Sequence, residues 1–259
     1  MKIFSKDMII TIIIGIILCI IVLISFGKKE TVVTSTEEYY PNLYVSKNYN
    51  PSPMEPETVY LTFDDGPSKN TDELMKILAR YDVKATFFVL GKNNEYISKV
   101  KDLNECGHTV APHTYSHNYE QIYAWTDSYI KDFNQIFELI QENGGGKSSI
   151  FRFPGGSKNS TVAPWARVAI IDEMNRRGFT YYDWNIVSGD DTPVVLAPEV
   201  LYQNVIKQEK GKESLVILFH DSDLYTTTPK AVELVIKHYL EKGWKFAPLT
   251  KDVAPIQFS

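Results

Sequence analysis

Apolar and polar residues alternate along most of the chain in blocks of two kinds. Short continuous apolar runs, typical of buried parallel strands, are separated by longer segments in which apolar residues recur at helical spacing. Strands are predicted over residues 59–63, 85–90, 109–111, 150–153, 179–184, 215–219 and 244–249, and helices over 71–81, 96–106, 128–142, 163–177, 198–210 and 229–241. Repeated strand–helix units predict an α/β fold with a parallel sheet, either open or closed into a barrel.

The first part of the chain departs from this pattern. Residues 8–26 are almost continuously apolar, and as a helix they would extend about 28 Å, enough to cross a bilayer. A cleaved signal peptide is the alternative, but its apolar region is usually shorter and ends in small residues. Residues 28–57 are rich in Thr, Ser, Asn, Tyr and Pro. We therefore expect a cytoplasmic tip and transmembrane signal anchor over 1–27, a flexible extracellular linker over 28–57 and one folded domain over 58–259.

Composition then excludes some classes of protein. The net charge is −5, and no stripe of Lys and Arg with interleaved aromatic residues is present, which argues against a nucleic-acid binder. The chain has 2 cysteines, and Cys19 lies in the apolar run, so no disulfide within the chain is expected. A monomer is expected. Lysines flank the apolar run on both sides, so charge alone does not fix its orientation.

Two adjacent carboxylates, Asp64 and Asp65, follow the predicted strand 59–63 and precede Gly66 and Pro67. This tetrapeptide is also ordinary turn chemistry. Adjacent acids repel each other, however, so a partly dry pocket keeps both ionised only when a cation or a hydrogen-bond donor lies nearby. The pair is therefore a candidate metal and base site.

Two of the 5 histidines, His113 and His117, are candidate partners for these acids. Histidines four residues apart can also merely share a helix face or lie on a loop. Two imidazoles and one carboxylate would leave a coordination position open for water and substrate, as in catalytic sites for divalent metals. Together, the acidic pair and the histidine pair favour such a site more strongly than either does alone.

Further polar residues fall at or just past the ends of different predicted strands. With the first acidic pair and His113, the set includes Arg152, Asp190 and His220. Residues from many strand ends converge on one face of a barrel, whereas an open sheet concentrates them at one switch point. We therefore expect a distorted, incomplete (β/α) barrel of about seven repeats.

Ordinary structural roles are the alternatives for the supporting residues. Arg152 also fits a structural salt bridge, Asp190 a turn cap, and His220 a loop histidine with satisfied hydrogen bonds. His108 and His238 have no polar company in the sequence, and we expect them to be structural or exposed to solvent.

The order and content of these motifs resemble the polysaccharide deacetylases with a NodB-homology domain, carbohydrate esterase family 4. The resemblance covers about residues 59–249. Its matching segments are Thr62-Phe63-Asp64-Asp65-Gly66-Pro67, His113-Thr114-Tyr115-Ser116-His117, Arg152-Phe153-Pro154-Gly155-Gly156 and Leu218-Phe219-His220. The family fold is a distorted barrel with fewer than eight repeats, in agreement with the layout above.

The resemblance implies a role for each matched residue of the first motifs. Asp64 corresponds to the general base and Asp65 to the acidic metal ligand, with His113 and His117 as the other ligands. Arg152 corresponds to the residue that holds the base in place. The expected ion is Zn²⁺, with Co²⁺, Mn²⁺ or Ni²⁺ as alternatives.

The later motifs are implied to supply the proton donor and the oxyanion site. His220 corresponds to the general acid, and the amide of Gly155 to an oxyanion donor. The fourth motif departs from the family form Asp-x-x-Asp-Trp, because residues 187–191 read Val-Ser-Gly-Asp-Asp. Asp190 would orient His220, whereas Asp191 replaces an aromatic wall of the acetyl pocket, for which Trp184 could compensate.

These parts together predict metal-dependent hydrolysis of N-acetyl groups, with acetate released from a glycan. An anchor and linker would place the domain on the cell-wall side of the cell membrane, which makes N-acetylglucosamine of peptidoglycan the leading substrate. The alternatives are N-acetylmuramic acid, chitin oligomers, a surface polysaccharide, acetylxylan, a surface glycan-binding protein with a degenerate site, and a ring amide hydrolase on the same barrel. The intact acids and histidines argue against a degenerate site.

Overall fold

The computed structural model describes residues 40–92 and 95–258. The transmembrane helix expected over residues 8–26 lies outside the described residues. Within those ranges, no helix combines the length and the apolar character that crossing a bilayer requires.

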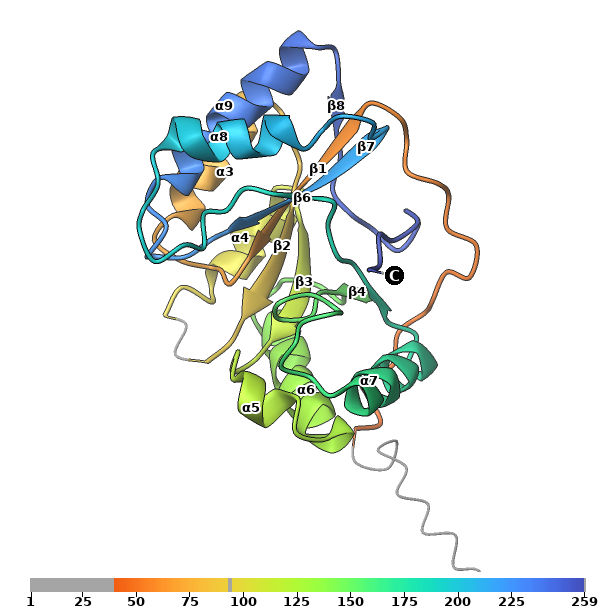
Figure 1. Cartoon of the computed structure of the whole chain (residues 1–259). Helices are drawn as coiled ribbons and strands as arrows, with labels where there is room; N and C mark the ends of the chain where they lie inside the picture. The colour runs from red at the N-terminus through yellow and green to blue at the C-terminus, as the bar shows by residue number, and fades with distance from the viewer. Residues whose placement is uncertain (1–39, 93–94, 259) are drawn as a thin grey trace, which may run out of the picture. The chain divides into compact units, whose positions relative to one another are not determined.

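Strands and helices alternate along the described chain, as the hydrophobic pattern predicts (Figure 1). The strands are β1 (Thr58–Asp64), β2 (Thr86–Leu90), β3 (Thr109–Thr114), β4 (Ile150–Phe151), β5 (Thr180–Tyr181), β6 (Ile186–Val187), β7 (Ser214–His220) and β8 (Lys245–Phe246). The helices are α3 (Thr71–Arg80), α4 (Lys99–Glu105), α5 (Tyr119–Ile122), α6 (Thr126–Glu142), α7 (Pro164–Arg176), α8 (Pro198–Lys207) and α9 (Thr228–Glu241).

The strands form a six-stranded sheet and a two-stranded sheet, and all of their pairings are parallel. The larger sheet has the order β3-β2-β1-β7-β6, with β8 also paired to β1, and the smaller sheet pairs β4 with β5. A backbone hydrogen bond of 3.3 Å from Arg152 N to Pro112 O joins β4 to the end of β3. The α/β class with a parallel sheet is therefore confirmed.

Strand β1 lies at the centre of the larger sheet, and each of its residues is buried. It pairs with β7 along its whole length, so Asp64 lies directly opposite His220. Apolar side chains from α3, α8 and α9 pack with β1 and β7 in the main core cluster. Because parallel strands are covered on both faces, this continuous apolar run is what a central strand requires.

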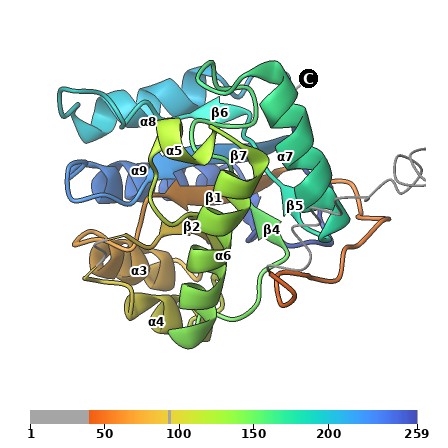
Figure 2. The same cartoon turned by 90° about the horizontal axis from the view of Figure 1, so that it is seen from below.

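Helices α6 and α7 cover the smaller sheet and enclose a second, largely aromatic core (Figure 2). Its rings include Phe133, Phe151 and Phe179, and Phe133 makes edge-on contacts with the other two at centroid distances of 5.3 and 5.0 Å. This cluster supports the short strand β4, which leads into Arg152.

Residues 40–57 differ from the flexible linker that the composition predicted over 28–57. Leu43 is fully buried in the aromatic cluster. Val45 N donates to Arg177 O, and the buried guanidinium of Arg177 donates to the carbonyls of Tyr40 and Leu43. This segment therefore belongs to the compact unit that begins at Tyr40. Its isolated apolar residues carry no period, so the pattern alone did not reveal this packing.

Candidate active site

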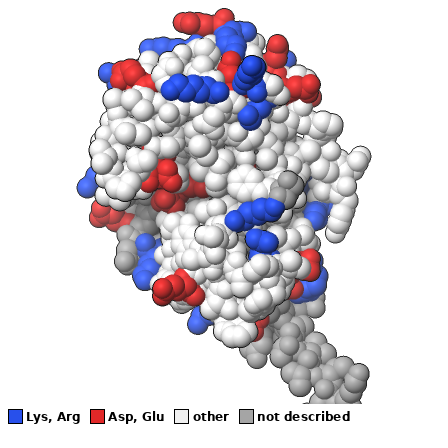
Figure 3. Space-filling model, viewed as in Figure 1, with Lys and Arg blue, Asp and Glu red and all other residues white. Residues whose placement is uncertain are grey.

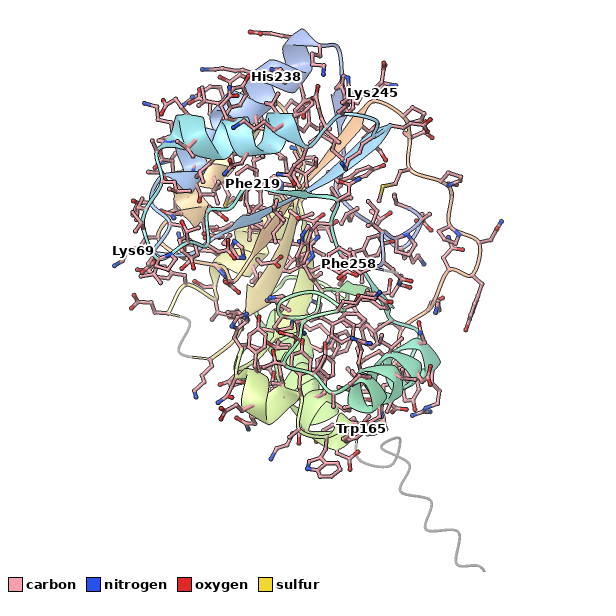
Figure 4. The ribbon with its side chains drawn as sticks, in the orientation of Figure 1. Lys69, Trp165, Phe219, His238, Lys245 and Phe258 are labelled. Carbon is pink, nitrogen blue, oxygen red and sulfur yellow. The ribbon has the colours of Figure 1, made fainter. Side chains whose placement is uncertain are left out.

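The candidate site opens at the carboxyl ends of β1, β3, β4 and β7. Lys69 and Phe219, labelled in Figure 4, mark the loop after β1 and the end of β7. Figure 3 shows acidic side chains in a hollow of the molecular surface, in the same orientation as Figure 1. A cavity of about 240 Å³ borders Asp65.

Asp64 ends β1 and is held by the guanidinium of Arg152. Arg152 Nη1 lies 3.0 Å from Asp64 Oδ1 and 2.7 Å from Thr62 Oγ1. Its remaining nitrogens donate to the carbonyls of Tyr182 and Asp183, at 2.9 and 3.1 Å, so the buried guanidinium is fixed in one orientation. Burial raises the pKa of Asp64, and the positive charge of Arg152 opposes that rise.

Three of the predicted residues converge as a possible metal site. Ligand atoms of Asp65, His113 and His117 all lie within 4.8 Å of one another. Asp65 Oδ1 is 3.4 Å from His117 Nε2 and 3.8 Å from His113 Nε2. This oxygen is buried and has no hydrogen-bond partner among the described residues. Because an unpartnered buried carboxylate oxygen is costly, the set fits a divalent cation.

The two ring nitrogens of His113 have different surroundings. Nδ1 lies 2.8 Å from the carbonyl oxygen of Arg152, so it carries the proton and donates it to that oxygen. Burial lowers the pKa of His113 to about 3, which leaves the imidazole neutral. Nε2 therefore presents its lone pair toward Asp65, as a metal ligand must.

Two non-glycine residues of this set have left-handed backbone conformations. The φ angle is 75° at Asp65 and 52° at His117. Such conformations cost free energy in residues with a Cβ, and they concentrate at functional sites. Asp65 follows β1 and His117 follows β3, and their side chains approach to 3.4 Å.

His220, at the end of β7, is paired with Asp190. His220 Nδ1 lies 2.8 Å from Asp190 Oδ1, and the backbone N–H of His220 donates to Oδ2 at 2.9 Å. Ser188 and Thr228 also donate to this carboxylate. Burial alone would lower the pKa of His220, but the hydrogen bond and charge of Asp190, together with the charges of Asp65 and Asp64, raise the pKa to about 9. The imidazole is therefore protonated at neutral pH.

Gly155 lies in the loop after β4 with a φ angle of 71°. A Cβ at this position would lie 2.8 Å from the hydroxyl oxygen of Tyr119 and 3.1 Å from Asn159 Cβ. The ring of Tyr119 in turn meets the ring of His117 edge-on at 5.3 Å. Sequence reasoning missed Tyr119, although its position two residues after His117 was a usable signal.

Asp191 is exposed, and Trp184 lies in a different environment. The indole of Trp184 lies over the guanidinium of Arg152, with its centroid 5.4 Å from Cζ, and packs edge-on against Phe258 at 5.1 Å. Trp184 therefore packs against Arg152. That Trp184 takes the place of the aromatic wall of the acetyl pocket stays a prediction.

Sequence reasoning also missed Asp221, which is fully buried directly after His220. Its carboxylate accepts hydrogen bonds from Ser68 Oγ at 2.5 Å and Thr71 Oγ1 at 2.6 Å. These bonds tie the loop after β1 to the end of β7. Burial raises the pKa of Asp221 to about 6.

Comparison with known proteins identifies the class. A polysaccharide deacetylase family model matches residues 52–173. A peptidoglycan-N-acetylglucosamine deacetylase of Bacillus cereus is 34% identical over 228 residues, which cover 85% of this chain and 80% of the relative. The chain belongs to the polysaccharide deacetylase family, whose members are metal-dependent hydrolases.

Solved structures agree in fold as well as in sequence. The catalytic domain of a peptidoglycan N-acetylglucosamine deacetylase from Eubacterium rectale is 35% identical, with a TM-score of 0.77, and the match covers 82% of this chain and 96% of that domain. A polysaccharide deacetylase from Bacillus cereus is 33% identical, with a TM-score of 0.68 and coverages of 78% and 96%. The two parallel sheets fit the barrel-like fold of the family.

Proposed function

We propose that this enzyme removes acetyl groups from N-acetylglucosamine residues of peptidoglycan, on an incomplete barrel of about seven repeats. The observation that carries the proposal is the geometry of one site. It holds a buried carboxylate bonded to Arg152, a ligand set with an unpartnered oxygen on Asp65, and His220 paired with Asp190 at 2.8 Å. Relatives named as peptidoglycan deacetylases support this choice of glycan.

Asp65, His113 and His117 would hold the metal, for which we propose Zn²⁺ because two imidazoles and one carboxylate are donors that it accepts. When bound, the ion supplies Lewis acidity and lowers the pKa of a coordinated water. His113 is preset for this role, since its bond to the Arg152 carbonyl fixes the tautomer.

Asp64 would act as the general base toward the water that attacks the acetyl carbonyl. Its carboxylate is aimed by Arg152 Nη1 at 3.0 Å, and that charge favours the ionised form against the effect of burial. A base with a somewhat raised pKa accepts a proton more readily than an exposed carboxylate.

His220 would donate a proton to the nitrogen that leaves as the free amine. Asp190 holds its imidazole through Nδ1, so the proton on Nε2 is the one available to substrate. The amide of Gly155 would donate to the oxygen of the acetyl carbonyl as negative charge develops there. His220 ends β7, and Gly155 lies in the loop after β4.

The apolar run at residues 8–26 supports a further part of the proposal, a single helix that anchors the enzyme in the cell membrane with the domain facing the wall. Protease digestion of intact cells should then remove the domain, which we propose to be monomeric, and leave the anchor. A domain that is protected until the cells are lysed would contradict this topology.

Acetate release by the full chain tests the proposed function. The protein is treated with a chelator, resupplied with zinc and assayed on peptidoglycan, on chitin oligomers and on acetylated xylan. Zinc-restored release from peptidoglycan is expected. Faster release from another polymer would show that this polymer is the preferred substrate and would leave the proposed chemistry unchanged. No release from any of them would contradict the proposal.

Asp64→Asn tests the proposed base in this assay, because the amide keeps the size of the carboxylate but cannot accept the proton. We expect acetate release to fall by about a hundredfold or more, as for loss of a general base. Elemental analysis should find the metal content unchanged, because Asp65, His113 and His117 remain. An unchanged rate would remove Asp64 from the base role.

A further inference from the structure

Two tryptophans, Trp125 and Trp165, lie against each other on the surface. They are 64% and 58% exposed, and their ring centroids are 5.6 Å apart with the planes inclined by 50°. Figure 4 labels Trp165 at the outer edge of the molecule, beside α6 and α7. An indole carries a large apolar surface and one N–H donor, so a paired and exposed arrangement is typical of a contact surface.

Local structure does not account for either tryptophan. Trp125 occupies the N-cap position of α6 with extended backbone angles and makes no side-chain cap hydrogen bond. Ser, Thr, Asp or Asn would stabilise that position better. Trp165 stands in the first turn of α7, directly after Pro164, and its ring is not part of the core clusters. Neither helix capping nor core packing therefore explains the pair.

The pair lies on the same face of the fold as the candidate active site. Trp125 and Trp165 begin the helices that follow β3 and β4, and in parallel strand–helix units helix N-termini lie at the carboxyl ends of the strands. Helix α5 connects the two regions, because Tyr119 contacts His117 at 5.3 Å and Tyr123 at 5.7 Å. Tyr123 also donates to the carbonyl of Pro154, beside Gly155.

We propose that Trp125 and Trp165 form a stacking platform for a sugar ring of the polysaccharide, outside the site where the acetyl group is hydrolysed. The proposal rests on the proposed function, since a polymeric glycan extends beyond the sugar that reacts. A pyranose ring has an apolar face of C–H groups and a rim of hydroxyls. Two inclined indoles can cover that face while the hydroxyls stay in water. The platform would then hold the chain while one residue occupies the site.

The test compares the full chain with the double variant Trp125→Ala/Trp165→Ala on insoluble peptidoglycan and on a short N-acetylglucosamine oligomer. We expect KM for the polymer to rise about tenfold, the loss of one strong contact, while kcat/KM for the short oligomer stays unchanged. Tyr49→Ala is the matched control, because Tyr49 is an 84% exposed aromatic that lies beside Asn175 at the other end of α7.

Co-sedimentation with insoluble peptidoglycan provides a binding readout that does not need turnover. The double variant should sediment less than the wild type and the Tyr49→Ala control. If the wild type sediments more than the double variant but releases no acetate, the proposed function fails while the platform stands. Equal sedimentation of all proteins, or an equal loss of rate on polymer and oligomer, would overturn the platform. So would self-association that the double variant abolishes, since the pair would then join two copies of the chain.

Discussion

At the scale of single residues, the proposed role of His220 as proton donor makes the Asp190–His220 pair the expected source of the enzyme's response to alkaline pH. In that proposed role His220 must carry a proton, and its pKa, raised to about 9, keeps the proton in place at neutral pH. Asp190→Asn removes the charge that raises this pKa, so the protonated fraction should be lost at a lower pH. We expect the alkaline limb of the kcat profile to move down by about one to three pH units.

Ser188→Ala is the control for this shift, because it removes a neutral donor to Asp190 but leaves the carboxylate charge in place. Its alkaline limb should lie much closer to that of the wild type. If the limb of Asp190→Asn coincides with the wild-type limb, His220 is not the group whose deprotonation limits the rate.

Gly155 and Tyr119 share one small space. Gly155→Ala places a methyl group 2.8 Å from the Tyr119 hydroxyl oxygen at a left-handed φ, so it should destabilise the fold through both crowding and strain. Tyr119→Phe removes the crowding oxygen and leaves the strain. Gly155→Ala should therefore lower the free energy of unfolding by about 1 kcal/mol less in the Tyr119→Phe background than in the wild type.

The comparison of Gly155→Ala with and without Tyr119→Phe is a double-mutant cycle, and Tyr81→Phe provides its reference. The Tyr81 hydroxyl bonds to Glu233, away from the site. Its effect on unfolding should add to that of Gly155→Ala without coupling. Equal coupling in both cycles would show that the Tyr119 hydroxyl is not what excludes a side chain at position 155.

At the scale of elements, Asp221 joins the loop after β1 to the end of β7. Asp221→Ala leaves the hydroxyls of Ser68 and Thr71 without their acceptor in a buried position. We expect a loss of about 2–4 kcal/mol in the free energy of unfolding, measured by denaturant titration. Asp223→Ala, which removes an exposed partner of Lys69, should cost less than about 1 kcal/mol. Equal losses would argue against the buried bridge.

The same scale shows what the sequence could and could not predict. Strands β1, β2 and β7 are continuous buried runs, so the apolar pattern located them. Strand β6 and helix α5, with 2 and 4 residues, were missed, because neither lies within one of the longer apolar blocks of the sequence. Thr71 is the first residue of α3, and its hydroxyl donates to Asp221 and accepts from the backbone N–H of Ser68. Such contacts between distant segments leave no local signal.

The candidate site was predictable to the extent that its residues carry chemistry. The acids, the histidines and the arginine could be recognised as site residues because their side chains suit catalysis or metal binding and they lie at the ends of predicted strands. The left-handed backbone at Asp65 and His117 and the position of Tyr119 beside Gly155 arise from tertiary packing. The spacing of residues along the sequence does not predict these features, so they become visible only in the folded structure.

At the scale of the whole molecule, a bound metal would link the ends of β1 and β3, because Asp65 follows one strand and His113 and His117 belong to the other and its loop. An ion that binds only the folded chain stabilises it by mass action. At a free concentration one hundred times Kd, the gain is about 2.7 kcal/mol, which should raise the Tm by roughly 5–10 °C. Calorimetry of the chelator-treated chain, with and without zinc, measures this shift.

His113→Ala should abolish the zinc-dependent rise in Tm, because it removes a proposed ligand whose other nitrogen is already fixed by the Arg152 carbonyl. His108→Ala separates this effect from the cost of losing any buried histidine. His108 is also buried and accepts from the Ala85 amide at 3.2 Å, but it is not part of the ligand set. Its baseline Tm should fall while the rise with zinc persists. A full zinc shift in His113→Ala would place the metal elsewhere, and the strand ends would then not be joined through this site.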